Sequence, residues 1–322
     1  MSLPKQSKMT KYDTQHNSID LGGNDSRLEL SKYSRKITSQ FGEDGIVEEM
    51  LRRIAATCAT DGWCVECGAS DGIYLSNTYH LISNKGYKGV LIEGDIKKYH
   101  SLCYNIPRTD VHKICRLVSF EISSTLDSIL ATTPIPYDFD FLSIDIDGCD
   151  YFIFESLENY RPKIVCVEYN YSIPNAVDFV QIKDIKIKQG ASAKSLTTLA
   201  GEKGYSLAAV TTANLIFVRS DFAVLVLGPE PQNLGQLRDD RKCQTFLFVG
   251  YDGTILSNKS DIVLPWHGVS LATTRLQLLP RMLRTLPSDY RLLQRLVYWL
   301  WMALRLPAAF REKLRERLRL RK

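Results

Sequence analysis

The chain has 322 residues, of which 44% are apolar, and this is enough to bury a full hydrophobic core. Its net charge of +5 is unevenly distributed: residues 275–322 carry 13 Lys and Arg against 3 Asp and Glu, so the preceding residues are acidic overall, at −5. An acidic body argues against a surface that neutralises nucleic-acid phosphates. The basic C-terminus instead indicates contact with an anionic surface or an acidic partner. No apolar run in the sequence is long enough to span a bilayer.

The predicted elements begin after a polar N-terminus. Residues 1–28 lack the apolar region of a signal peptide and are predicted to be disordered. Between Phe41 and about Ser220, helix and strand patterns alternate. The predicted helices cover residues 43–56, 74–85, 96–106, 151–160 and 193–205. The predicted strands cover residues 63–67, 89–95, 111–119, 139–150 and 163–170, and residues 206–220 have the pattern of a terminal β-hairpin.

Near-continuous apolar strands separated by helices predict an α/β fold with a mostly parallel, doubly wound sheet. In such sheets the ligand binds beyond the carboxyl ends of the strands, at the point where the strand order reverses. Five candidate residues fall at these ends: Gly68, Glu93, Asp145, Asp147 and Glu168. The predicted topology therefore gathers four acids on one edge of the sheet.

The eight cysteines lie mostly in predicted core segments, and only Cys64 and Cys67 form a C-x-x-C pair. On a strand, residues i and i+3 point to opposite faces, and no second pair follows. We therefore interpret the cysteines as buried thiols in a reducing compartment, and not as zinc ligands or a redox pair.

The first strand ends in the loop E-C-G-A-S-D-G, residues 66–72, which raises the question of its ligand. The loop has neither the Gly-Lys-Ser/Thr of a Walker loop nor the G-x-G-x-x-G of a dinucleotide fold. Carboxylates repel a pyrophosphate, whereas they attract an ammonium group and accept hydrogen bonds from ribose hydroxyls. S-adenosylmethionine carries a sulfonium, an ammonium and a ribose diol without a phosphate, so it suits this loop better. Glu93 supports this interpretation because an acid at the second strand end can accept both ribose hydroxyls, although NAD-binding folds share this feature.

A family resemblance is carried by five segments: SQFGEDGIVEEML, VECGASDGIYLSNT, GVLIEGD, FDFLSIDIDGCDYFIFESL and KIVCVEYNYSIP. They resemble the FkbM-type S-adenosylmethionine-dependent methyltransferases, and most closely the bacterial branch with an S-Q-F-G-E-D-G-I opening motif. The similarity runs from about Ser39 to about Gly268. It implies a class I methyltransferase fold: a Rossmann-like, mostly parallel seven-stranded sheet with a terminal antiparallel hairpin. The departure from the family is the loop itself, since many relatives have D-V-G-A-N-x-G there.

The motif and the resemblance together predict the residues that contact S-adenosylmethionine. They are Gln40, Asp44, Glu66, Gly68, Ala69, Asp71, Gly72, Glu93, Gly94 and Asp145. The family position of Gln40, Glu43 and Asp44 suggests a flap over the cofactor, and a plain helix N-cap is the alternative.

The predicted catalytic residues are Asp145, Asp147 and Glu168, because methyl transfer to a hydroxyl needs alignment of the reactants and a group that takes the hydroxyl proton. In one interpretation a carboxylate is the general base. In another, Asp145 with Glu168 or Asn170 holds Mg²⁺ or another divalent cation that lowers the pKa of the acceptor hydroxyl. In a third, Asp147 and Asp150 only cap the following helix, which we favour for Asp150.

The resemblance implies O-methylation of a sugar, a glycan or a related metabolite. A nucleotide-sugar glycosyltransferase that uses Asp145-Ile-Asp147 as a metal-binding D-x-D is one alternative. Another is a non-catalytic, membrane-associated binding protein that keeps a methyltransferase fold.

The C-terminal third is predicted to contain two further parts after the methyltransferase domain of residues 29–220. Residues 221–287 form an extension or cap, in which His267 of L-P-W-H-G is interpreted as a packed turn histidine. Residues 288–322 form a basic amphipathic helical tail whose apolar stripe is Leu293, Leu296, Val297, Leu300, Trp301 and Leu304. A helix in the interface of an anionic membrane and a helix docked on its own core or a dimer seam are both open, and the basic end favours the membrane. The expected location is cytoplasmic, with peripheral contact at the inner face of the membrane.

Overall fold

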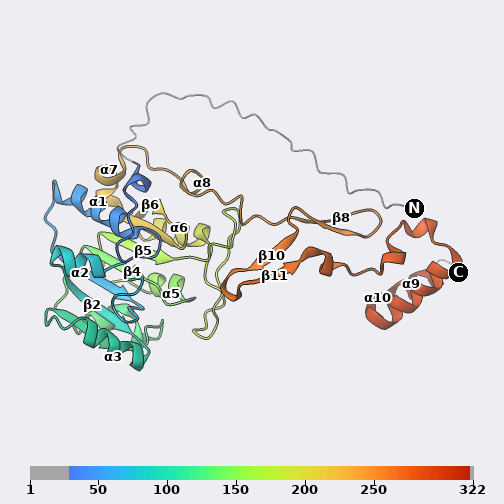
Figure 1. The fold of residues 1–322 in the computed structure, drawn as a ribbon, viewed down its shortest axis with the longest axis horizontal. Coiled ribbons are helices and arrows are strands. Elements are labelled where there is room, and N and C mark those ends of the chain that lie inside the picture. Colours follow the sequence, from blue (N-terminus) through green and yellow to red (C-terminus); the bar gives the residue numbers. More distant parts are fainter. Residues whose placement is uncertain (1–28, 320–322) are drawn as a thin grey trace.

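The structure is a computed structural model that describes residues 29–319, with side chains described to residue 316. The predicted disordered segment 1–28 and the last three residues of the predicted tail lie outside the described residues. Figure 1 shows a sheet domain, an extended arm that leaves it, and a pair of helices at the far end of the arm.

A seven-stranded sheet forms the centre of the domain, and its strand order is β3-β2-β1-β4-β5-β7-β6. The strands are β1 (Trp63–Cys67), β2 (Lys88–Glu93), β3 (Val111–Cys115), β4 (Phe141–Ile144), β5 (Ile164–Glu168), β6 (Tyr205–Val210) and β7 (Asn214–Arg219). Strands β1 to β5 are parallel, and β7 is antiparallel to both β5 and β6. This confirms the predicted fold class, including the terminal hairpin.

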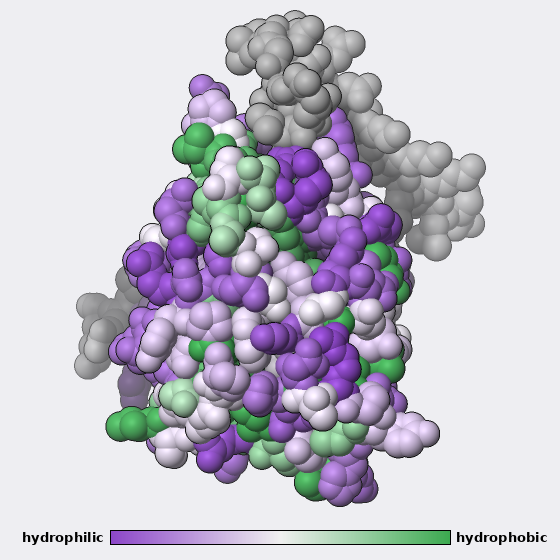
Figure 2. Space-filling model, turned by 90° about the vertical axis from the view of Figure 1, so that its left-hand side faces the viewer, coloured by the Kyte–Doolittle hydropathy of each residue, from purple (hydrophilic) through white to green (hydrophobic). Residues whose placement is uncertain are grey.

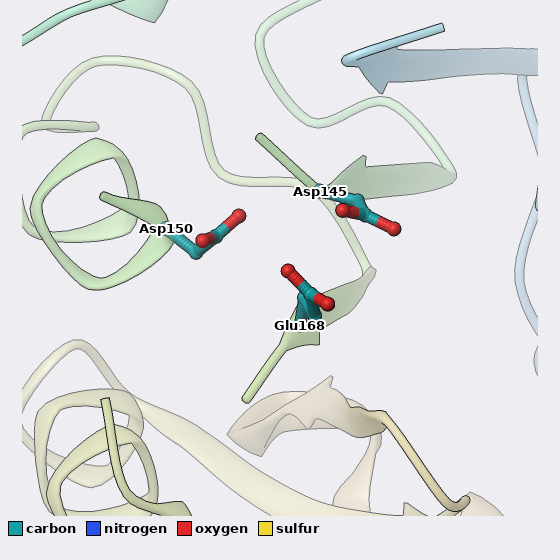
Figure 3. Close-up of side chains that lie close together, drawn as sticks. All are labelled: Asp145, Asp150 and Glu168. Carbon is teal, nitrogen blue, oxygen red and sulfur yellow. The ribbon is translucent and has the colours of Figure 1, made fainter. Parts of the chain in front are cut away.

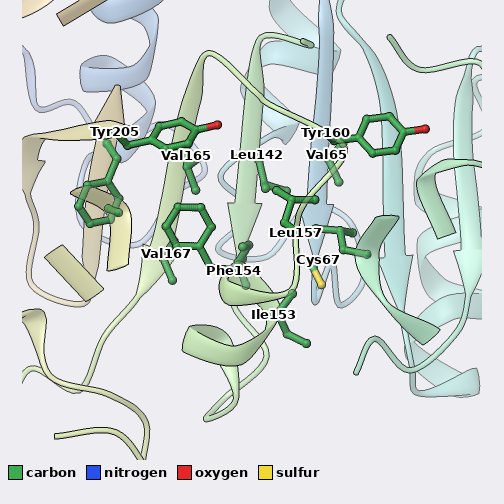
Figure 4. Packing of buried hydrophobic residues seen from close by; sticks show 14 of the residues in the cluster. Val65, Cys67, Leu142, Ile153, Phe154, Leu157, Tyr160, Val165, Val167 and Tyr205 are labelled. Atoms are coloured by element: carbon green, nitrogen blue, oxygen red, sulfur yellow. The ribbon is translucent and has the colours of Figure 1, made fainter. Parts of the chain in front are cut away.

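Helices cover both faces of the sheet. They are α1 (Glu43–Ala55), α2 (Tyr79–Lys85), α3 (Ile96–Asn105), α4 (Leu126–Leu130), α5 (Asp150–Glu155), α6 (Ala193–Glu202) and α7 (Ser220–Leu227). One core cluster joins α4, α5 and α6 to the sheet, and a second joins α1, α2, α3 and α7 to the opposite face. In Figure 4, Val65, Leu142 and Val165 of neighbouring strands pack with residues of α5.

The two core clusters place the C-x-x-C pair on opposite faces of the sheet, as predicted. Cys58 and Cys115 are exposed, so the interpretation of the cysteines as buried thiols is wrong for these two. Cys67 belongs to the α5 side and Cys64 to the α1 side, both are fully buried, and all eight cysteines are free thiols. Burial raises the pKa of both thiols well above its usual value. Neither is therefore a thiolate available to a metal.

Two predicted helices are shorter in the structure than in the sequence analysis. The helix expected over residues 74–85 begins at Tyr79, because the preceding residues bind a buried carboxylate described below. The helix expected over residues 151–160 ends at Glu155. Helical periodicity alone could not reveal either limit.

The arm beyond α7 contains short elements and ends in two helices. They are α8 (Leu234–Leu237), the hairpin β8 (Leu247–Val249) and β9 (Ile255–Ser257), the hairpin β10 (Asp261–Leu264) and β11 (Val269–Ala272), and then α9 (Leu292–Arg305) and α10 (Pro307–Arg319). No helix among residues 29–319 has the length and hydropathy needed to cross a bilayer. In Figure 2, polar side chains cover most of the visible end of the sheet domain.

Candidate functional site

The acids at the strand ends lie on one side of the sheet. Three of these acids are Glu66, Glu93 and Glu168. The residue two positions before each of them belongs to the core cluster on the α1 side of the sheet. Because alternate residues of a strand share a face, all three side chains lie on the α1 side at the carboxyl edge. The edge is thus acidic across β2, β1 and β5.

The loop after β1 has an unusual backbone. Gly68, Ser70 and Gly72 have positive φ angles of 87°, 48° and 82°. A Cβ on Gly68 would lie 1.8 Å from the carbonyl oxygen of Asp145, so the loop passes in direct contact with the end of β4. Only glycine allows this approach, and it brings the two central strand ends together.

Glu66 is 5% exposed, and its carboxylate accepts three hydrogen bonds within the protein. The donors are Ser76 Oγ at 2.6 Å, the Asn77 backbone N–H at 2.7 Å and Thr78 Oγ1 at 2.7 Å. Burial raises the pKa of Glu66, which these hydrogen bonds oppose. Glu66 therefore holds the segment before α2, and its contact with a cofactor stays a prediction.

Two more of the predicted cofactor residues bind the backbone around them. Asp71 Oδ1 accepts the N–H groups of Ile73 at 3.0 Å and Tyr74 at 2.8 Å. Asp44 Oδ2 accepts three successive N–H groups, of residues 37–39, each at 2.8 Å. A bridge between Ser39 and Leu75 places this opening segment against the loop after β1, which is where a flap over that loop would lie. Gln40, within the segment, is exposed.

Glu93 ends β2 and keeps capacity for a ligand. Its Oε2 accepts the Ser70 N–H at 2.8 Å and its Oε1 accepts the Asp95 N–H at 2.7 Å. Each oxygen retains a lone pair, since an ionised carboxylate offers about four acceptor positions. Ala69 beside it is buried in the core, and a Cβ on Gly94 would lie 3.2 Å from the Leu117 side chain.

Three carboxyl groups converge on the other half of the edge. Asp145 follows β4, Asp150 begins α5 and Glu168 ends β5, and one oxygen from each lies within 4.8 Å of the others. Figure 3 shows the three side chains pointing toward one another. We call them the acid trio.

Partial loss of contact with water changes the ionisation of the acid trio, in which Asp150 is buried and Glu168 is half-buried. Burial, followed by the charges of Asp145 and Asp150, raises the pKa of Glu168 to about 10. Burial and Asp147 raise the pKa of Asp145 to about 6, and burial and Asp145 raise the pKa of Asp150 to about 7. Like charges at this spacing cannot all ionise together, so the acid trio keeps a proton or takes up a cation.

Asp150 does more than start its helix. Its two oxygens accept the N–H groups of Ile146 at 2.8 Å and Gly148 at 2.9 Å, which closes the turn between β4 and α5. The expectation that Asp150 caps the following helix is wrong, because Cys149 is the N-cap residue and α5 has no side-chain cap hydrogen bond. The place of Asp150 in the acid trio was not predicted either. Asp147 lies within this turn, exposed, with a φ angle of 57°.

Asn170 has its amide engaged with neighbouring residues. Its Nδ2 donates to the Gln189 carbonyl at 2.8 Å, and its Oδ1 accepts from Ser172 Oγ at 2.6 Å. A metal-binding role for Asn170 stays a prediction.

A cavity of about 270 Å³ opens beside the acid trio, and the arm forms part of its wall. Glu168, Asp150 and Lys188 line it from the domain, and Trp266 and His267 line it from the turn between β10 and β11. His267 is exposed, so its interpretation as a packed turn histidine is wrong.

A larger cavity of about 1200 Å³ continues along the junction of domain and arm. Tyr171 and Trp266, with ring centroids 5.2 Å apart, contribute aromatic surface to it.

The sequence analysis also missed the residues that fix this wall. Gln181 is 3% exposed, and it accepts the N–H groups of residues 189 and 190 while donating to two carbonyls of its own loop. Arg238 donates to the carbonyls of Tyr171 and Ile173, which ties the start of the arm to the loop after β5. Both residues lie in segments without periodicity, so no sequence signal identified them.

One buried side-chain polar atom has no hydrogen-bond partner among the described residues, and it lies at this edge. It is Oδ1 of Asn214, a residue that is 4% exposed and pairs with Glu168 across β5 and β7. Directly opposed residues share a face of a sheet, so Asn214 lies on the same side as Glu168. Its amide Nδ2 donates to Glu43 at 3.0 Å.

Residues 121–191 match the family model of the methyltransferase FkbM domain. The matched segment contains the acid trio and Gln181, and extends to the loop that precedes α6. The strand order with an antiparallel β7 is that of class I S-adenosylmethionine-dependent methyltransferases, in agreement with the match.

The chain is also similar to solved structures, at low sequence identity. A S-adenosylmethionine-dependent methyltransferase from Aquifex aeolicus has 10% identity and a TM-score of 0.33, over 58% of this chain and 94% of its own. An O-methyltransferase from Bacillus cereus has 20% identity and a TM-score of 0.34, over 53% and 88%. The CMeT domain of the citrinin polyketide synthase has 10% identity and a TM-score of 0.37, over 57% and 55%. No curated protein matches the chain.

Proposed function

We propose that this protein transfers a methyl group from S-adenosylmethionine to a hydroxyl group of a sugar, a glycan or a related metabolite. The observation that carries the proposal is the acidic edge of a class I methyltransferase sheet, with the acid trio inside the segment that matches the FkbM domain. Acids suit a cationic donor without a phosphate.

The donor side of the site is the loop after β1 together with Glu93. S-adenosylmethionine supplies an electrophilic methyl group on a sulfonium. Glu93 accepts the ribose hydroxyls with the lone pairs that its two backbone contacts leave free. The buried Oδ1 of Asn214 has no donor among the described residues, so it can accept a hydrogen bond from the ammonium group of S-adenosylmethionine.

The acceptor side is the cavity beside the acid trio. Asp145 is proposed as the general base, because it directly follows the central strand β4, beside Gly68 of the donor loop. The acceptor oxygen bonds to the methyl carbon, the carbon–sulfur bond breaks, and the hydroxyl proton passes to Asp145. Glu168 is a positioning partner whose carboxylate lies within 4.8 Å of that of Asp145, and Asp147 lines the cavity.

A divalent cation is the second candidate for activating the hydroxyl. Three converging carboxyl groups with raised pKa values are the hard oxygen ligands that Mg²⁺ and Ca²⁺ prefer. The residues that would hold it are Asp145, Asp150 and Glu168, and it would lower the pKa of a bound hydroxyl. Activity that survives thorough chelation leaves Asp145 as the base, and activity restored by Mg²⁺ or Mn²⁺ after chelation assigns the role to a cation.

A sugar acceptor is supported by the walls of the junction cavity. Tyr171 and Trp266 offer flat aromatic surface for the apolar face of a sugar ring, next to carboxylates that accept hydrogen bonds from its hydroxyls. Trp266→Ala is expected to raise the KM for a sugar acceptor and to leave the affinity for the donor unchanged.

Binding calorimetry tests the donor. S-adenosylhomocysteine is expected to bind the full chain, whereas NAD and a UDP-sugar with manganese are not. Binding of the UDP-sugar instead would overturn the proposal. It would favour a glycosyltransferase in which Asp145-Ile-Asp147 is a metal-binding D-x-D motif. The acid trio joins Asp145 to Asp150 and Glu168, with Asp147 outside it, which favours the methyltransferase.

Methyl transfer itself is tested with radiolabelled S-adenosylmethionine and a panel of glycosides, nucleotide sugars and lipid-linked sugars. The proposal is supported if wild type forms a labelled product from one of these acceptors and Asp145→Asn does not. Donor binding without product from any acceptor would favour the non-catalytic alternative.

A further inference from the structure

The two helices at the end of the arm carry an exposed row of leucines. They are Leu292, Leu293, Leu296, Leu300 and Leu304 of α9, each with between 62% and 76% of its surface exposed. At 3.6 residues per turn, the five fall within an arc of about 120° of the helix. We call them the leucine row.

Other α9 residues, outside the leucine arc, are buried or contact α10. Met302 is 4% exposed, the rings of Trp299 and Phe310 lie 5.7 Å apart, and Lys313 Nζ donates to Tyr298 Oη at 2.7 Å. These contacts join α9 to α10 into a helical hairpin. The leucine row is therefore not the side on which the two helices meet, and Figure 1 shows the hairpin far from the sheet domain.

The charge of the hairpin identifies what covers the row. Arg295 and Arg305 lie on α9 outside the leucine arc, and Arg291 directly precedes the helix. The exposed side chains of Arg311, Lys313 and Arg315 follow on α10. Residues 275–322 together carry 13 Lys and Arg against 3 Asp and Glu. A leucine face beside arginines, with Tyr298, Trp299 and Trp301 on the same helix, is typical of a helix that lies in a membrane interface.

We propose that the α9–α10 hairpin binds the surface of an anionic bilayer, with the leucine row in the acyl boundary and the arginines at lipid phosphates. A second copy of the chain is a poorer occupant, because it would bring two strongly basic tails together. A nucleic acid is poorer as well, because its phosphates leave the leucines uncovered. The proposal does not depend on methyl transfer, and its failure would leave the proposed function unaffected.

The test is co-sedimentation of the full chain with vesicles of phosphatidylcholine, with and without phosphatidylglycerol. Wild type is expected to bind the anionic vesicles and to bind phosphatidylcholine alone far more weakly. Leu296→Ser/Leu300→Ser should weaken binding to anionic vesicles by about 10-fold or more, because the loss of leucine burial lowers affinity. Arg311→Gln/Arg315→Gln should weaken it by about 20- to 30-fold, and added salt should weaken wild type similarly.

The matched control is Val224→Ser/Leu278→Ser, since both residues are about as exposed as the leucine row, at 70% and 71%, and lie outside the hairpin. The control is expected to bind like wild type. Unchanged binding in the leucine variant, or equal loss in the control, would overturn the proposal. Light scattering covers the remaining occupant: a wild-type dimer that becomes monomeric in the leucine variant, without vesicle binding, would assign the row to a second copy.

Discussion

The two halves of the acidic edge contain the same kind of side chain in different states. On the donor half, Glu66, Asp71 and Glu93 each accept two or more hydrogen bonds from nearby backbone or hydroxyl groups. In the acid trio, the closest neighbours of the carboxyl groups of Asp145 and Glu168 include other acids. The comparison teaches that position at a strand end does not define a role, and that the partners of a carboxylate decide whether it shapes a loop or reacts.

The largest effect on activity is expected from the acid trio, where Asp145 and Glu168 face other acids. Asp145→Asn should lower kcat by about 10²- to 10⁴-fold, because it removes the proposed proton acceptor and keeps the shape of the side chain. Steady-state rates with an identified acceptor measure it, and Asp147→Asn is the control, since asparagine tolerates the positive φ of that position. Similar losses in both variants would show that general negative charge matters, and not a base at Asp145.

The donor half should respond through stability. Glu66→Ala leaves the Asn77 N–H and two hydroxyl groups without their buried acceptor, so unfolding should become easier by about 2–4 kcal/mol. Urea denaturation measures this free energy of unfolding. A variant with wild-type stability and no affinity for S-adenosylhomocysteine would instead make Glu66 a ligand-binding residue and remove the difference between the halves.

The mostly parallel sheet, the terminal hairpin and the acids at the strand ends could be predicted from the sequence. They could be predicted because the alternation of strands and helices, and the alternation of faces along a strand, are local properties of the sequence. Sequence reasoning could not separate the two halves. Ser76 and Thr78 fit the helical pattern of the sequence, but in the structure they precede α2 and their hydroxyl groups donate to the carboxylate of Glu66. Asp150 looked like a cap because its convergence with Glu168 depends on the packing of α5 against β5.

The wall of the cavity was beyond prediction for a related reason. Trp266 and His267 lie about 100 residues after Glu168, and the contact depends on how Arg238 anchors the arm. Neither periodicity nor spacing encodes such a contact. The tail was predicted as amphipathic and helical, but the packing of α9 against α10, which decides which apolar residues stay exposed, required the structure.

The pH dependence of stability sharpens the comparison on the side of the acid trio. The folded pKa values of Asp145, about 6, and Asp150, about 7, exceed the usual carboxyl value of each, so the folded protein binds more protons than the unfolded chain. Stability is therefore expected to be greater at low pH and to fall, by an amount on the order of 4 kcal/mol, as the pH rises from about 5 to 8. Denaturant titrations at each pH check this.

Glu168→Gln should make this fall shallower, because Glu168, with a pKa of about 10, keeps a proton in the folded protein across this pH range and loses it on unfolding. If the acid trio holds a cation, Mg²⁺ or Mn²⁺ should raise the Tm more at pH 8 than at pH 5, where protons compete for the same oxygens. If the free energy of unfolding of wild type does not change between pH 5 and 8, the charges of the acid trio are stabilised by nearby donors in the folded protein, like those of the donor half.

The smallest expected effect concerns Asp71, where shape and charge can be separated. Asp71→Asn keeps the Oδ1 atom that accepts the N–H groups of Ile73 and Tyr74, so the Tm should stay near that of wild type. If the charge attracts the sulfonium, affinity for S-adenosylmethionine should fall about 3- to 10-fold, with a smaller loss for the neutral thioether of S-adenosylhomocysteine. Asp71→Ala also loses the turn, at a cost of about 1 kcal/mol in stability. Equal affinity of Asp71→Asn and wild type for both compounds would assign Asp71 to the loop alone, and would restrict the electrostatic preference for the donor to Glu93 and the acid trio.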